Sequence, residues 1–251
     1  FQVNKSILPE VLESDAFYGQ SEALIKKLPI YGVIGDQQSA AIGQKCFNFG
    51  DIKSTYGTGC FMLMNTGQNL VSSNSQLLST TAFNILGQKN FALEGSIFNA
   101  GTVVQWMRDE MNFVNESYEI EDLAHKSQNK VQFVPAFTGL GAPYWKSNIR
   151  GQISGITRNT SKSDIALAAL KSICFQTRDL FECLLKDTAL NRNKFSLKVD
   201  GGMSKNNLMM QFLSNILQVK IERPVNQEST AVGAAYLAGI QSGMYKGVAD
   251  V

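Results

Sequence analysis

Apolar side chains recur at helical spacing in four segments, which we predict to be helices. These segments are residues 100–113, 161–187, 204–217 and 229–243. In the longest, Ser161 and Asp164 have the spacing of a capping box, which starts a helix. One apolar stripe runs along that helix through Leu167, Leu170, Cys174, Phe181 and Leu184.

Short apolar runs bounded by glycine or polar turns predict the strands. Residues 31–36 form one such run, 51–67 predict two strands around a glycine turn, and 77–86 and 90–98 predict two more. A buried strand is expected at 130–137, and another at 195–202 that leads into a glycine turn. Residues 1–29 are expected to be irregular, apart from a helical piece near 21–28. Strands come first and then alternate with helices, which predicts an α/β fold with a mixed sheet and flanking helices.

Charge and composition exclude several classes of function. The net charge is +2 and the basic residues are scattered, so the chain has no electrostatic footprint for nucleic acid or an anionic membrane. No apolar run is long enough to span a bilayer, and no secretory leader opens the sequence. Because the first residue is Phe1 rather than Met, we expect a piece of a longer protein.

Cysteine and histidine usage argues against metal or triad chemistry. The four cysteines have no CxxC spacing, so they are expected to be free thiols of a protein in the reducing cytoplasm. The single histidine, His125, stands among polar neighbours and is expected at the surface. A zinc site and a Ser-His-Asp triad are therefore not predicted.

Three glycine-containing turns follow predicted strands: "YGTGC", "VDGGM" and the "NAG" that opens a helix. Such junctions aim backbone N–H groups and the positive end of a helix at one point, which suits phosphate groups. The residues alone leave two interpretations open, ordinary structural turns or a nucleotide site. The P-loop, a complete GxGxxG and the protein-kinase motifs are absent.

Asp36 is the candidate catalytic residue, because it follows the apolar run of residues 31–35 with no histidine, lysine or cysteine beside it. The carboxylate at this position has two interpretations from the residues alone. It caps the helix that follows, or it accepts a proton from a substrate.

Several of these stretches together resemble the glycerol kinase branch of the FGGY carbohydrate kinase family. They are "GDQQSAAIGQ", "STYGTGCFMLMNTG", "LEGSIFNAGTVVQWMRDE", "FVPAFTGLGAPYW", "QTRDL" and "VDGGMSKNNLMMQF". The resemblance runs from about residue 6 to residue 245. It implies the actin-like, ribonuclease-H-like ATPase fold, built from two such domains with a cleft between them.

The resemblance covers only the second half of such an enzyme. Residues 1–44 would be the end of the N-terminal kinase domain and a connecting helix, and 45–251 the C-terminal nucleotide-binding domain. The family's Asp-x-Gly-Thr phosphate turn and the Arg-Glu pair and tyrosine that hold the polyol are missing. The expected partners are therefore the absent N-terminal domain, glycerol and ATP, and assembly into a homo-oligomer is left open.

The resemblance also assigns roles on the alcohol side. Asp36 aligns with the family's catalytic aspartate, which accepts the proton of the attacking hydroxyl as the γ-phosphoryl group of ATP is transferred. Gln37 would hydrogen-bond the polyol, and Phe61 would pack on its carbon backbone.

On the nucleotide side, Thr58 would contact the phosphates of ATP, and Gly101 and Gln105 would lie beside the nucleotide on one helix face. Gly202 and Asn206 would line the adenosine pocket. Magnesium is expected to arrive on the ATP phosphates, so no side chain is predicted as a metal ligand.

One loop departs from the family pattern. After "GAPYW" the chain reads "KSNIRG", where Lys146 and Asn148 replace the usual acidic residues. This loop is expected near the surface. We predict the ATP-binding portion of a cytoplasmic glycerol kinase that is inactive alone; the alternatives are another FGGY sugar kinase or a non-catalytic nucleotide-binding module.

Overall fold

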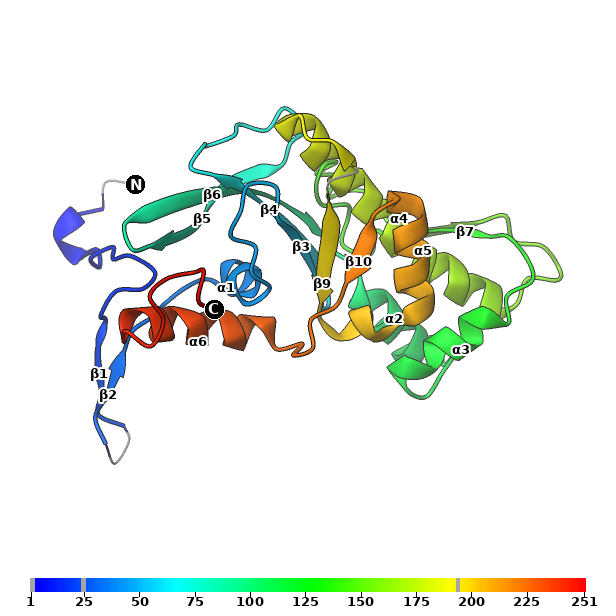
Figure 1. Ribbon diagram of the computed structural model, residues 1–251. Coiled ribbons are helices and arrows are strands. Elements are labelled where there is room, and N and C mark those ends of the chain that lie inside the picture. Colours follow the sequence, from blue (N-terminus) through cyan, green and yellow to red (C-terminus); the bar gives the residue numbers. More distant parts are fainter. Residues whose placement is uncertain (1–2, 24–25, 193–194) are drawn as a thin grey trace.

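A six-stranded mixed sheet forms the centre of the fold, in the strand order β10-β9-β3-β4-β6-β5 (Figure 1). The computed structural model describes residues 3–23, 26–192 and 195–251. Strands β10, β9 and β3 run parallel to one another, whereas β3, β4, β6 and β5 pair antiparallel. The strands of this sheet are β3 (Ile52–Tyr56), β4 (Cys60–Gly67), β5 (Leu78–Ile85), β6 (Gln88–Ile97), β9 (Ser196–Asp200) and β10 (Lys220–Glu222).

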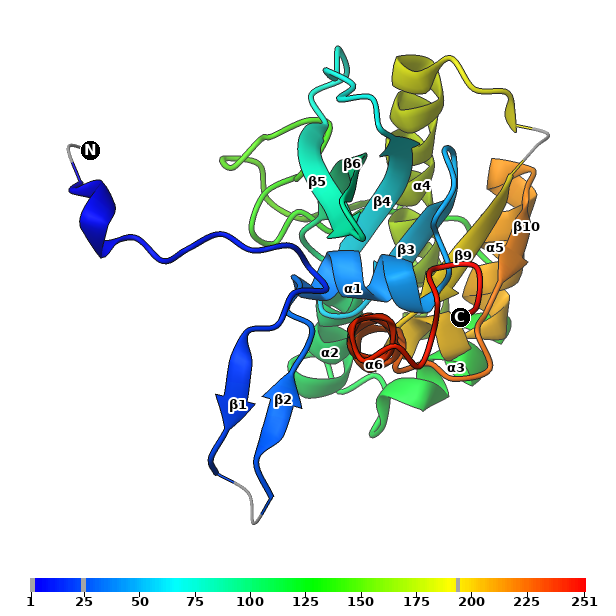
Figure 2. The same cartoon turned by 60° about the vertical axis from the view of Figure 1, so that its left-hand side comes forward.

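Two small antiparallel pairs lie outside this sheet. They are β1 (Gly19–Ser21) with β2 (Leu28–Ile30), and β7 (Gln132–Val134) with β8 (Gln152–Ser154). Figure 2 shows the β1–β2 pair projecting away from the sheet and its helices.

Helices cover both faces of the sheet. One face packs on α2 (Gly101–Asp109), α4 (Lys162–Thr188) and α5 (Asn207–Leu217), together with α3 (Ile120–His125), around the larger apolar core. The other face carries a smaller core under α1 (Asp36–Gly43) and α6 (Ser229–Gln241) (Figure 1). Both faces of the central strand β3 are therefore buried, which is the arrangement of a layered α/β fold.

Helices α1 and α6 cross at very close range. A side chain on Gly233 would place its Cβ 1.9 Å from the carbonyl oxygen of Ser39, so only glycine fits at this crossing. The Ser39 hydroxyl also donates to the carbonyl oxygen of Thr230 at 2.7 Å. These contacts fix α1, and with it Asp36 at its first turn, against the C-terminal helix.

The four helices predicted from apolar spacing and the two predicted hairpins are confirmed, with ends that differ by a few residues. The α/β class with a mixed sheet is confirmed as well. At the start of α4 the Ser161 hydroxyl accepts from the Asp164 N–H, and Asp164 Oδ2 accepts from the Ser161 N–H at 2.8 Å, so the capping box is confirmed.

The predicted strand at 31–36 is wrong. Residues 31–35 have no regular structure, and α1 begins at Asp36. The run finds no neighbouring strand, because β1 pairs with Leu28–Ile30 just before it. Its Val33 N–H instead donates to the Ser14 carbonyl oxygen at 3.1 Å.

Two further expectations need correction. Where the helical piece was predicted near 21–28, β1 ends at Ser21 and β2 begins at Leu28, while residues 24–25 lie outside the described residues. The buried strand predicted at 130–137 is the short strand β7, in which Phe133 alone is buried, because β7 pairs only with β8 at the periphery. No helix in the described ranges is long and apolar enough to cross a membrane.

Candidate functional site: a cavity beside the carboxyl ends of two parallel strands

A cavity of about 580 Å³ opens where the parallel strands β3 and β9 end. Its size lies within the usual range of small-molecule sites, and ligands of α/β sheets typically bind at this edge. The walls come from the turn after β3, the first turns of α2, the segment before α3 and the start of α5. The lining residues are Tyr56, Gly57, Thr58, Gly101, Val104, Gln105, Arg108, Glu116, Ser117, Tyr118, Ile120, Glu121, Gly202, Met203, Lys205 and Asn206.

The turn between β3 and β4 is tied to the N-terminus of α2. The Gly57 carbonyl oxygen accepts from the Gly101 N–H at 2.9 Å, and the Thr58 carbonyl oxygen accepts from the N–H groups of Ala100 (2.9 Å) and Thr102 (3.1 Å). These bonds use the carbonyl groups of the turn and leave Thr58 exposed at the cavity. Ala100 caps α2 without a side-chain hydrogen bond, and the turn after β3 supplies the acceptors for the first N–H groups of this helix instead.

The junction between β9 and α5 forms the facing wall. Gly201 has φ +84, and its Cβ would lie 2.4 Å from the Tyr56 carbonyl oxygen, so the backbone at this turn requires glycine. The next residue, Gly202, is exposed, and a Cβ there would meet no atom within 4 Å. Asn206 Oδ1 accepts from the Met209 N–H at 2.8 Å, which caps α5 and leaves the amide nitrogen as a donor at the cavity.

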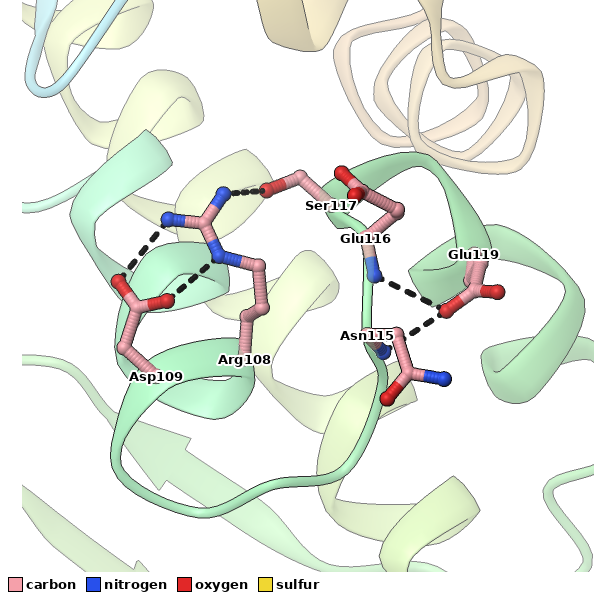
Figure 3. Close-up of polar contacts among 6 residues, drawn as sticks. All are labelled: Arg108, Asp109, Asn115, Glu116, Ser117 and Glu119. Carbon is pink, nitrogen blue, oxygen red and sulfur yellow. Dashed lines mark hydrogen bonds and ion pairs between the residues drawn. The ribbon is translucent and has the colours of Figure 1, made fainter.

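The outer wall consists of residues 115–121, which Arg108 links to α2. Figure 3 shows the Arg108 guanidinium against the carboxylate of Asp109, with its third nitrogen donating to the Ser117 hydroxyl at 2.9 Å. Glu119 accepts from the backbone N–H groups of Glu116 and Asn115 (Figure 3), and these bonds lower the pKa of its carboxyl. Polar contacts therefore hold this wall in two places: Arg108 ties it to α2, and Glu119 ties it to its own backbone.

All five residues predicted on the nucleotide side line this one cavity. They are Thr58, Gly101, Gln105, Gly202 and Asn206. They come from three segments that are far apart in the sequence and meet only in the fold. Their individual contacts with a nucleotide stay predictions.

The three residues predicted on the alcohol side lie on the α1 face of the sheet. Asp36 is the exposed first residue of α1, and its Oδ1 accepts from the Gln37 N–H at 2.8 Å. The N-cap residue is Gly35, so Asp36 stands one position inside the helix rather than at the cap. Phe61 on β4 pairs with Thr55 on β3, and it remains 43% exposed.

A buried lysine lies beneath this group. Lys53 on β3 is 0% exposed, and its Nζ donates to Gln37 Oε1 and, at 3.0 Å, to Thr55 Oγ1. Burial lowers the pKa of the Lys53 ammonium, and the negative charges of Asp200 and, more weakly, Asp36 oppose that shift. The Asp200 carboxylate is itself 2% exposed, and its Oδ1 has no hydrogen-bond partner among the described residues.

Strand β3 connects the two groups of residues. Gln37 contacts Lys53, which contacts Thr55, and Thr58 at the cavity follows three residues later. Three residues of extended chain span at most about 11 Å. The Asp36 side and the cavity therefore meet near the carboxyl end of β3, with Phe61 opposite Thr55 on the neighbouring strand.

The sequence interpretation missed Lys53 and most of the outer wall of the cavity. The sequence does place Lys53 inside a predicted strand. Its position indicates a buried lysine only once helices are known to cover both faces of that strand. Arg108, Tyr118 and Lys205 gave no distinguishing signal, because charged and aromatic residues on predicted helices and loops usually face solvent.

The remaining candidate residues are peripheral. His125 is exposed, and all four cysteines are free. Lys146 and Asn148 are exposed, as expected for a surface loop. Within the described ranges, no group of three or more histidine, cysteine, aspartate or glutamate side chains could hold a metal ion.

Comparison with known proteins shows the family to which the chain is related. Residues 52–242 match the C-terminal domain of the FGGY family of carbohydrate kinases. Glycerol kinase 1 of Pseudomonas aeruginosa is 48% identical over 255 residues, which cover 100% of this chain and 51% of that protein. Glycerol kinase of Ectopseudomonas mendocina is 50% identical and covers 98% of this chain and 50% of its own length. The chain thus spans about half the length of these relatives.

Solved structures show the same correspondence. The crystal structure of Plasmodium falciparum glycerol kinase with ADP has a TM-score of 0.88 at 40% identity, covering 98% of this chain and 50% of that one. A xylulose kinase from Lactobacillus acidophilus matches with a TM-score of 0.83 at 22% identity, covering 98% of this chain and 51% of its own, and it shows the fold alone. These neighbours are sugar kinases of the actin-like ATPase fold, so that expectation is confirmed.

Proposed function

Because this chain belongs to the FGGY family of carbohydrate kinases, we propose that it is the C-terminal, nucleotide-binding portion of an ATP-dependent glycerol kinase. The reaction converts ATP and glycerol to sn-glycerol 3-phosphate and ADP. The observation that carries the proposal is the single cavity lined by Thr58, Gly101, Gln105, Gly202 and Asn206.

The cavity has the features that an adenine nucleotide needs. Gly202 leaves open space for a flat base, and the Asn206 amide nitrogen and Gln105 supply polar contacts at its edge. The exposed Thr58 hydroxyl, on the turn after β3, suits the phosphates. Magnesium would be carried by the phosphates and water rather than by a cage of side chains.

Bound ATP supplies the phosphoryl group; the residues of this chain position the alcohol and receive its proton. Asp36 presents an exposed carboxylate as the general base, at the first turn of α1. Gln37 offers a side-chain amide to a hydroxyl, and the exposed ring of Phe61 offers an apolar surface to the carbon backbone.

The rest of the active site would belong to the N-terminal half that the relatives have in addition. In this proposal residues 1–44 end the N-terminal domain and connect it to the nucleotide-binding domain of residues 45–251. The full-length protein would be cytoplasmic, which the four free cysteines support.

A coupled assay of ADP release tests this proposal on two polypeptides: this chain alone, and this chain joined to an N-terminal FGGY kinase half. We expect glycerol-dependent ADP release from the joined polypeptide and none from the chain alone. Greater activity of the joined polypeptide on a pentulose or gluconate would identify another FGGY sugar kinase. A joined polypeptide that binds ADP but phosphorylates no sugar or polyol would identify this chain as a non-catalytic binding module. Robust turnover by the chain alone would contradict the division of the site between two halves.

A further inference from the structure

Lys53 is an unusual residue for the interior of a sheet. Removing an ammonium group from water is unfavourable unless the group is well paired. Lys53 is nevertheless 0% exposed, and it is absent from the ion pairs found among the described residues. Its Nζ instead donates to two neutral acceptors, Gln37 Oε1 and Thr55 Oγ1.

The contact with Gln37 determines how that side-chain amide is oriented. A lysine ammonium has three donors and no acceptor, so the atom of Gln37 that faces Nζ is the oxygen. The Gln37 NH₂ group then faces away from Lys53, and it makes no hydrogen bond within the described part of the chain. The buried cation therefore presents Gln37 to the site as an N–H donor.

The carboxylates around Lys53 explain how its charge is tolerated. Asp200 on β9 and Asp36 on α1 both favour the ammonium form. Glu94 on β6 lies in the same cross-strand row as Lys53, through Leu63 on β4. Burial raises the pKa of the Glu94 carboxyl, while Lys53 lowers it. Charge balance alone would not require Nζ to contact Gln37, so that contact points to a second role.

We propose that Lys53 is a positioning residue for the alcohol: it fixes the Gln37 amide as a donor beside the Asp36 acceptor. A hydroxyl oxygen accepts a hydrogen bond while its proton is donated elsewhere, so this adjacent pair fits an alcohol group. The inference rests on the proposed roles of Gln37 and Asp36. It adds a determinant of alcohol binding that makes no contact with the alcohol itself.

A double-mutant cycle in the joined two-half polypeptide tests this role. Lys53→Met removes the donor, Gln37→Met removes the amide, and the cycle combines them. We expect Lys53→Met to raise the KM for glycerol about tenfold or more, the worth of a charged hydrogen bond, and to change the KM for ATP less than about twofold. In the Gln37→Met background the lysine substitution should add little, because the two residues act as one unit.

Lys198→Met is the matched control. Lys198 pairs in register with Lys53 on the neighbouring strand, but its Nζ donates to the backbone carbonyl oxygen of Lys45 at 3.0 Å. Its substitution should leave both KM values near those of the wild type. Equal effects of Lys53→Met and Lys198→Met, additive effects in the cycle, or an equal rise in the KM for ATP would overturn the inference. Absence of glycerol turnover in the wild-type polypeptide would instead refute the proposed function.

Gln37→Glu keeps the inference testable if Lys53→Met does not fold. This variant retains a partner for the Lys53 ammonium but replaces the outward N–H donor by a carboxylate oxygen. We expect a rise in the KM for glycerol similar to that expected of Lys53→Met. An unchanged KM for glycerol would show that the donor orientation of Gln37 has no part in alcohol binding.

Discussion

Asp36 combines two properties at the scale of a single residue. It is exposed at the first turn of α1, and the only hydrogen bond to its carboxylate within the described ranges comes from the N–H group of the next residue. A carboxylate oxygen of this kind is available to a hydroxyl, and α1 is held in place by its close crossing with α6. Gln37 and the exposed ring of Phe61 lie on the same face of the sheet as Asp36. A structural role of the Asp36 carboxylate would not explain this grouping, whereas a role in alcohol binding does.

Replacing Asp36 with asparagine should reduce turnover in the joined polypeptide by roughly 10² or more, the usual contribution of a general base. The amide has nearly the same shape, so the affinity for ATP should hardly change. Steady-state kinetics with glycerol and ATP varied separately measure both effects. Turnover equal to that of the wild type would show that Asp36 is not the base.

At this scale the sequence led to eight site residues, but mainly through the family resemblance. Glycine turns and a lone carboxylate can be recognised in a sequence, whereas the partner of a side chain depends on packing. Lys53 illustrates the limit. Its burial follows from helices on both faces of β3, and its contact with Gln37 joins segments that no local pattern connects.

At the scale of elements, Asp164 joins the start of α4 to the loop that precedes β7. Its carboxylate is 1% exposed and accepts from the N–H groups of Asn129 (2.7 Å), Gln128 (2.8 Å) and Ser161 (2.8 Å). These backbone hydrogen bonds, that of Asn129 first, hold the pKa of the Asp164 carboxyl well below its usual range. The capping box seen in the sequence is thus part of a larger junction.

Asp164→Ala should lower the free energy of unfolding by about 3 kcal/mol at pH 7, because it removes a helix cap and leaves buried N–H groups unpaired. The folded-state pKa is depressed, so this stabilisation is fully present above about pH 4, the pKa of an unfolded aspartate, and is lost as the pH falls further. Urea unfolding at pH 7 and pH 3 measures it. The difference between the wild type and the variant should shrink at pH 3; an equal or larger difference there would contradict this account.

Elements with a long periodic pattern were predictable, and short ones were not. The helix at 162–188 has an apolar stripe and a cap that are visible in the sequence. The run at 31–35 has the composition of a strand, but a strand needs a partner, and the neighbouring β2 is already paired with β1. Whether a short apolar run becomes a strand depends on the segment with which it pairs, and that partner cannot be read from the composition of the run.

At the scale of the whole molecule, the sheet separates two sets of functional residues and β3 joins them. The cavity lies beside the ends of β3 and β9, next to α2 and α5, while Asp36 and Gln37 lie on the opposite face, at the first turn of α1. A phosphoryl group held at the Thr58 turn would therefore approach an alcohol held beside Asp36 near the end of β3. The sequence suggested several phosphate-binding turns, but only the fold brings two strand-end turns and α2 to one cavity.

The most direct test of the central claim is calorimetric titration of this chain with ADP, for the wild type, Gly202→Ala and Gly202→Leu. A Cβ at Gly202 meets no protein atom within 4 Å, so Gly202→Ala should keep the wild-type melting temperature, and the melting temperature of Gly202→Leu is measured beside it. We predict that ADP binds the wild type and that its affinity falls stepwise, by about tenfold or more with leucine, because the larger side chain fills space meant for the base. Equal ADP affinities in all three folded proteins, or no binding to the wild type, would show that this cavity is not the nucleotide site.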